Sequence, residues 1–181
     1  MRTAALLLAL AGCGGGLPAD TVRVSPLQPP DVDPLVGFGA RTLVEANTAR
    51  ETAVVHLELF HGGRMDLRRE IGRAPFASPM RATFTTDTSG PERQLFVELV
   101  PCDAEGAPVG DARTLNAPFP DDFPAKGGLL SPVMTLDPSE HPDDAFAPLF
   151  GVRRGGTISF TGPAGPFGSD EIVLRVVVRL E

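Results

Sequence analysis

The residues best suited to acid–base or metal chemistry lie around the histidines of the chain. His56 and Glu58 fall in a run of alternating apolar and polar residues, so they share one face of a predicted strand. A catalytic zinc takes three protein ligands and keeps one position open. His61 starts a predicted turn and, by strand parity, faces away from His56. We therefore interpret His56 and Glu58 as a solvated strand face. An enzyme that combines His56 with distant carboxylates, metal-dependent or hydrolytic, is an alternative.

A second candidate site is the acidic stretch 137–144. Calcium takes six to eight oxygen ligands, and carboxylates supply them well. The spacing here does not match the twelve-residue EF-hand loop, and two prolines interrupt it. We interpret the stretch as a solvated acidic loop and expect no obligatory metal and no cofactor. Its carboxylates are the candidate calcium ligands: Asp137, Glu140, Asp143 and Asp144.

Phenylalanines in Pro/Gly-rich segments form a third candidate site. Aromatic residues on loops can anchor a ligand or a partner protein in a pocket. They also close the open ends of a β-sandwich, and we favour that simpler interpretation. The candidate binding residues are Phe119, Phe123, Phe146 and Phe150.

Other catalytic patterns are missing from the sequence. There is no G-x-S-x-G motif to place a nucleophilic serine. Gly37-Phe38-Gly39 lacks the third glycine of a nucleotide-binding loop. The sequence thus contains no recognisable catalytic constellation.

Alternating hydrophobicity predicts the strands that must position these residues. In the segment 172–180, Val176 belongs to the row that faces the core, whereas Arg175 is predicted to face solvent. The same alternation marks 55–59 and 95–99 as strands. These segments predict half-buried antiparallel strands.

Glycine and proline divide the chain into short segments. The sequence has 20 glycines and 19 prolines, with turn signals at 61–63 and 103–106. We expect an all-β, antiparallel β-sandwich of nine or ten strands, with at most one short helical turn, near 142–146. The expected architecture is immunoglobulin-like or jelly-roll-like, but this is a likeness of architecture and not of family. The chain has no Trp and no Tyr, so it lacks the core tryptophan and the tyrosine corner of immunoglobulin domains.

The N-terminal residues indicate where the protein resides. A cationic Met1-Arg2 precedes an apolar run and the tetrapeptide Leu10-Ala11-Gly12-Cys13. This layout resembles the lipobox of bacterial lipoproteins. The resemblance implies a signal peptide at 1–12, a palmitoylated Cys13 with a short tether at 13–19, and one domain at 20–181. It also implies a membrane-anchored protein of the cell envelope, in the outer membrane if the bacterium is Gram-negative.

Charge and cysteine content narrow the choice of partner. The formal net charge is −7 with no basic cluster, which disfavours nucleic acid. Cys102 is left without an intrachain partner, and we expect it to be buried. Our leading hypothesis is a non-enzymatic binding or adaptor domain with a partner in the envelope. A small-ligand receptor that uses the loop phenylalanines is a further alternative.

Overall fold

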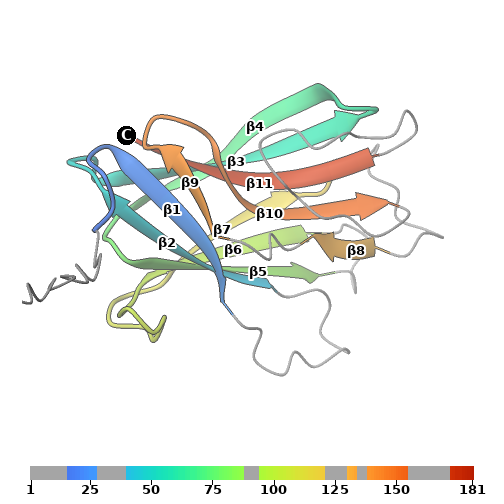
Figure 1. Cartoon of the computed structure of the whole chain (residues 1–181). Coiled ribbons are helices and arrows are strands. Elements are labelled where there is room, and N and C mark those ends of the chain that lie inside the picture. The colour runs from blue at the N-terminus through green and yellow to red at the C-terminus, as the bar shows by residue number, and fades with distance from the viewer. Residues whose placement is uncertain (1–15, 28–39, 88–93, 121–129, 134–137, 155–171) are drawn as a thin grey trace, which may run out of the picture.

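Two antiparallel sheets make up the described part of the molecule (Figure 1). The computed structural model describes residues 16–27, 40–87, 94–120, 130–133, 138–154 and 172–181. Eleven strands occur in these ranges, and no helix does, so none of the described residues forms a helix that could span a membrane. The predicted all-β sandwich is confirmed, with slightly more strands than expected.

Sheet A contains six strands and sheet B five. In spatial order, sheet A consists of β7 (Arg113–Pro118), β6 (Gln94–Pro101), β5 (Met80–Asp87), β2 (Ala40–Asn47), β1 (Thr21–Leu27) and β9 (Ser139–Pro142). Sheet B consists of β4 (Arg64–Pro75), β3 (Thr52–His61), β11 (Ile172–Leu180), β10 (Ala147–Arg154) and β8 (Leu130–Val133).

The core lies between the inner faces of the two sheets. In β11, Leu174, Val176, Val178 and Leu180 are at most 1% exposed, as the alternation predicts. Phe84 of sheet A stacks on Phe150 of sheet B, with ring centroids 4.9 Å apart. Burial of such apolar surface is the main stabilising contribution, at about 25 cal/mol per Å². Further core residues include Val24, Val44, Leu57, Leu95, Val97, Leu174 and Val178.

The predicted turns have the expected backbone. Gly62 and Gly63 have φ of 54° and 80°, values that favour glycine, and they connect β3 to β4. Gly106 closes the other turn with φ of 84°, and its N–H donates to the Asp103 carbonyl at 3.0 Å. The stretch near 142–146 is a hydrogen-bonded turn between β9 and β10, and not a helical one.

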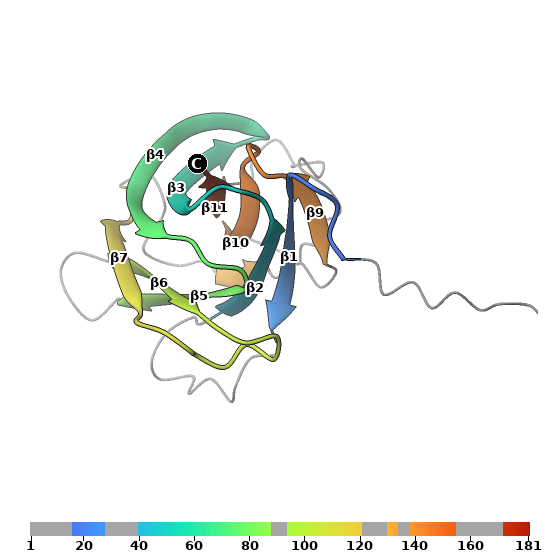
Figure 2. The same ribbon diagram turned by 90° about the vertical axis from the view of Figure 1, so that its left-hand side faces the viewer.

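One side of the sandwich is closed by contact between β4 and β7. The Arg69 guanidinium donates to the Pro118 carbonyl of β7 at 3.0 Å. A Cβ at Gly72 would lie 2.7 Å from a Leu115 methyl carbon, so the two strands approach closely. Figure 2 shows β4 curving over toward β7.

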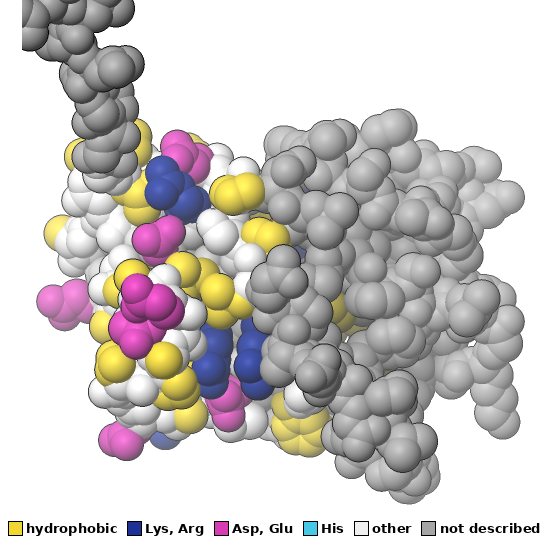
Figure 3. All heavy atoms as spheres, turned by 60° about the horizontal axis from the view of Figure 1, so that its bottom comes forward, with side chains coloured by type: hydrophobic (Ala, Val, Ile, Leu, Met, Phe, Trp, Pro, Cys, Tyr) yellow, Lys and Arg dark blue, Asp and Glu magenta, His cyan; other side chains and the backbone are white. Residues whose placement is uncertain are grey.

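The outer face of sheet A is a mixed charged surface (Figure 3). Arg23 forms ion pairs with Glu140 at 2.7 Å and Glu45 at 4.0 Å. Arg81 lies 3.6 Å from Glu98. Acidic and basic side chains alternate with scattered apolar ones over the described part of this face.

One end of the sandwich collects the start of β1 and the end of β11, on the left in Figure 1. We call it the Leu17 end. The Asn47 side-chain amide donates to the Leu17 carbonyl at 2.8 Å. The Glu51 N–H donates to the Glu181 carbonyl at 3.2 Å. The Gly62-Gly63 turn lies at the opposite end, because β3 runs the length of the sandwich between them.

Candidate functional site

The outer face of sheet B contains a buried charge cluster, the Glu58 cluster, made of Glu58, Arg68 and Arg175. Glu58 of β3 is directly opposite Arg175 of β11 on one side and Arg68 of β4 on the other. Its side chain is 0% exposed. Arg175 Nε donates to Glu58 Oε2 at 2.7 Å, and Arg68 Nε donates to Glu58 Oε1 at 2.8 Å. Both carboxylate oxygens are therefore engaged by guanidinium groups.

This cluster corrects two sequence-based interpretations. Glu58 was expected on a solvated strand face, and Arg175 was expected to face solvent, but Arg175 is only 8% exposed. A buried charge is costly unless it is paired and hydrogen-bonded. The charge-assisted bonds to Glu58 supply that pairing. Parity correctly places both residues outside the core, but this part of the outer face is also covered.

Phe146 lies beside the Glu58 cluster, just before β10. Its ring meets the His56 ring edge-on, with centroids 5.1 Å apart. The Arg68 guanidinium carbon lies 4.0 Å from the Phe146 centroid, and that of Arg179 lies 5.7 Å from it. Cation–π contacts of this kind are worth roughly 0.5–2 kcal/mol. Phe146, half-buried, thus forms an aromatic and cationic surface with these neighbours.

The surroundings of His56 shift its pKa in opposing directions, with a net lowering. Burial lowers the pKa of His56, opposed mainly by the charge of Glu70, which is directly opposite it on β4. The His61 ring contacts the carboxylate of Asp66. Since both oxygens of Glu58 are occupied, His56, Glu58 and His61 do not form a ligand set. No group of three or more metal-ligating side chains occurs among the residues described.

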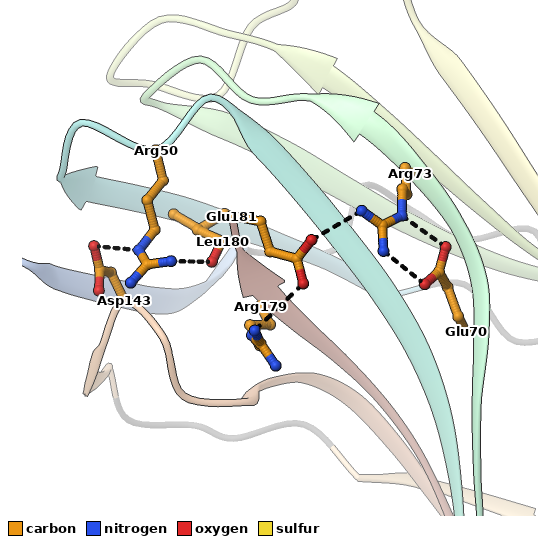
Figure 4. A network of polar contacts seen from close by, with 7 residues as sticks. All are labelled: Arg50, Glu70, Arg73, Asp143, Arg179, Leu180 and Glu181. Carbon is orange, nitrogen blue, oxygen red and sulfur yellow. Dashed lines mark hydrogen bonds and ion pairs between the residues drawn. The ribbon is translucent and has the colours of Figure 1, made fainter.

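A second polar cluster lies at the Leu17 end (Figure 4). We call Thr48, Arg50 and Asp143 the Asp143 cluster. Arg50 Nε lies 2.9 Å from Asp143 Oδ2, and Arg50 Nη1 donates to the Leu180 carbonyl at 3.2 Å. The Thr48 hydroxyl donates to Asp143. These contacts, the Thr48 hydrogen bond first, lower the pKa of Asp143. The cluster fastens the turn after β9 to the turn before β3.

An ion-pair chain continues from this cluster across the end of β11. Glu181 accepts from Arg73 at 2.8 Å and lies 3.4 Å from Arg179. Arg73 also pairs with Glu70 at 2.9 Å, and that hydrogen bond lowers the pKa of Glu70. Figure 4 shows the Arg73 guanidinium between the carboxylates of Glu181 and Glu70, and the Arg179 guanidinium directed at Glu181.

An open depression of about 840 Å³ borders the Asp143 cluster. Its lining includes Asp20, Arg50, Glu51, Asp144 and Glu181. Acidic side chains outnumber basic ones, and its one arginine is already paired with Asp143. The depression is therefore a shallow acidic surface.

The predicted calcium ligands do not converge. Glu140 belongs to strand β9, where it is exposed and accepts from Arg23 at 2.7 Å. Asp143 is buried in its own cluster, whereas Asp144 is exposed. Asp137 lies outside the described residues. The stretch is thus a strand and a turn, and not one solvated acidic loop.

The candidate phenylalanines do not form one site in the described part of the molecule. Phe150 was predicted on a loop, but it belongs to β10 and is a core residue, 5% exposed. Phe119 is half-buried and packs against the core. Phe123 lies outside the described residues. Of the four, Phe146 alone is described on the outer face of sheet B.

Of the two cysteines, the structure describes only Cys102. Cys102 is buried, as predicted, and burial raises the pKa of its thiol. Cys13 lies outside the described residues.

No protein-family model, no curated protein and no solved structure matches this chain.

Sequence reasoning missed Arg68, Arg175, Arg50 and Thr48 as partners in these clusters. A signal was present for the first two. The segments 58–70 and 171–181 both place arginines on the polar side of a strand pattern. Opposite charges on neighbouring strands stabilise each other, but the sequence alone does not show which strands are neighbours.

Proposed function

We propose that this chain is a lipid-anchored protein of the bacterial cell envelope whose β-sandwich is a non-enzymatic binding or adaptor domain. The observation that carries the anchor is Leu10-Ala11-Gly12-Cys13 behind a short apolar run. The folded strands begin at Thr21, shortly after Cys13. This spacing fits a folded domain attached through a short tether.

The Phe146 surface supports the binding role. Aromatic and arginine side chains dominate the energetics of protein interfaces, above all when the scaffold holds them in place. Here Phe146 is fixed between His56, Arg68 and Arg179. Arg68 is in turn fixed by Glu58. Such a preorganised surface loses little conformational entropy when a partner binds.

The two alternatives are less well supported. The enzyme hypothesis needs carboxylates near His56, but Glu58 is occupied by two arginines and Glu70 by Arg73. The small-ligand hypothesis needs phenylalanines that line a pocket, but Phe150 belongs to the core. A binding surface for another macromolecule makes the fullest use of the residues exposed here.

Metabolic labelling tests the anchor. Cells that produce the protein should incorporate labelled palmitate into it, and the protein should fractionate with membranes. Cys13→Ser should abolish both, whereas Cys102→Ser, the same change at a buried cysteine, should preserve both. Unlabelled protein in the medium, or label retained in Cys13→Ser, would contradict the proposal.

In-cell photo-crosslinking tests the binding role. A photoreactive phenylalanine analogue in place of Phe146 should give a discrete adduct identifiable by mass spectrometry. The same analogue in place of Asn116, which is exposed on the edge strand β7, serves as the control. Equal adducts at both positions, or none at Phe146, would count against this surface.

A further inference from the structure

The start of the domain is fixed to the Leu17 end. The Leu17 carbonyl accepts from Asn47, and the Asp20 carbonyl accepts from the Asp143 N–H at 2.9 Å. β1 then begins at Thr21, paired with β2 on one side and with β9 on the other. The point from which the N-terminal segment leaves is therefore a rigid part of the sandwich.

The segment between the proposed anchor, Cys13, and this point is short. Cys13 and Gly16 are three residue steps apart, which is about 11 Å when fully extended. By contrast, β3 contains 10 residues, so it spans about 33 Å between the two ends of the sandwich. This upper limit holds for any conformation of residues 13–16. An anchor on Cys13 can reach one end of the sandwich but not both.

We infer that the lipidated protein stands on the bilayer with its Leu17 end against the lipid headgroups. This inference rests on the proposed lipid anchor. The surface turned to the membrane is then the acidic depression, with Asp20, Glu51 and Asp144 exposed around it. The Gly62-Gly63 turn is carried away from the membrane, to the far end of β3.

The charge of this surface defines the lipid chemistry that it fits. Carboxylates gain nothing from anionic phosphates, and repulsion acts over a Debye length of about 8 Å at physiological salt. Zwitterionic headgroups, which carry an ammonium or quaternary amine, are compatible with it. The acyl chains, and not the protein surface, therefore supply the attraction to the membrane.

Energy transfer to the bilayer tests the orientation. In a Cys102→Ser background, Glu51→Cys places a donor dye at the Leu17 end, and Arg64→Cys places it at the opposite end. Arg64 is 84% exposed, so a dye is tolerated there. The lipidated protein in phosphatidylcholine vesicles with an acceptor lipid should transfer several-fold more efficiently from position 51 than from position 64. Equal transfer, or more from position 64, would overturn the inference.

A longer tether provides the matched control. Insertion of about ten Gly/Ser residues after Gly16 adds a flexible chain comparable in reach to the sandwich itself. The difference between positions 51 and 64 should then shrink while palmitate labelling persists. A difference that persists would mean that contacts other than the tether set the orientation.

Failure of the inference can be told apart from failure of the anchor. Absence of palmitate from the protein removes both. Palmitate present with the wrong end near the membrane removes only the orientation. Cys13→Ser protein should also stay in the supernatant when mixed with phosphatidylglycerol vesicles, and sedimentation with them would refute the role given to the acidic surface.

Discussion

The two faces of β11 are buried by different means. Toward the core, Leu174, Val176 and Val178 are at most 1% exposed and pack against apolar side chains. On the other face, Val173 and Val177 are 0% exposed, yet Arg175 between them is paired with the fully buried Glu58. The first face needs only apolar bulk, whereas the second also needs a specific charged partner.

This difference shows what strand parity can and cannot predict. Alternation assigns each residue to a side of the sheet, because successive side chains point in opposite directions. It does not report whether that side is covered. An outward arginine is therefore compatible with solvent or with a buried ion pair, and only its neighbours distinguish the two.

The largest expected effect is on the core face. Val176→Asp places a carboxylate among apolar side chains with no partner, at a cost of about 4 kcal/mol or more. We expect the variant to be unfolded or to melt far below the wild type in calorimetry. A melting temperature close to that of the wild type would mean that this face of β11 is not the core.

Removal of the charge from the outer face comes next. Arg175→Ala leaves Glu58 buried with Arg68 alone, and we expect a loss of about 2 kcal/mol in the free energy of unfolding. Arg179→Ala is the matched control, because Arg179 lies on the same strand and face but is partly exposed. Its effect should stay under about 1 kcal/mol. Equal effects in urea denaturation would show that burial of Arg175 contributes nothing.

Local sequence patterns predicted much of the fold. The turns at 62–63 and 103–106, the strand 172–180 and its core row follow from glycine positions and alternation. Phe150 was misplaced because Pro and Gly near it suggested a loop, whereas pairing of β10 with β11 makes that segment a strand. Propensity yields to pairing in such cases.

The candidate site was less accessible to sequence reasoning. Glu58 and Arg175 are 117 residues apart, and they meet because β11 inserts between β3 and β10. Thr48, Arg50 and Asp143 meet across two turns in the same way. Strand order determines these contacts, and no local pattern encodes strand order.

A smaller effect should appear in the pH dependence of stability. Burial, aided by the charge of Arg175, lowers the pKa of His141 below its ordinary value. Below pH 6.5 the unfolded chain then takes up a proton more readily than the folded one, so the free energy of unfolding decreases as the pH is lowered. His141→Gln should lessen this fall between about pH 6.5 and 5. At pH 7.5, where the histidine is neutral in both states, titration makes no contribution.

This pH test also probes the covered outer face. If Arg175 were solvated, its charge would be screened and would affect His141 little. The combination of Arg175→Ala with His141→Gln should then show whether the two changes are coupled. An unchanged pH slope in His141→Gln would contradict the burial of this histidine.

The smallest expected effect is that of calcium, for which we expect none. The candidate calcium ligands Asp143 and Glu140 share one property: their carboxylates are already bonded within the chain. Asp143 is held by Thr48 and Arg50, and Glu140 by Arg23. A calcium ion would have to displace these partners to gather its six to eight oxygens.

Calorimetry with EDTA and with excess calcium should give the same melting temperature. A bound ion at a hundredfold excess over its Kd would add about 2.7 kcal/mol, which is easily measured. A calcium-dependent rise that disappears in Asp144→Asn, which leaves the Arg50 contact to Asp143 in place, would show that the exposed carboxylates recruit an ion despite these pairs.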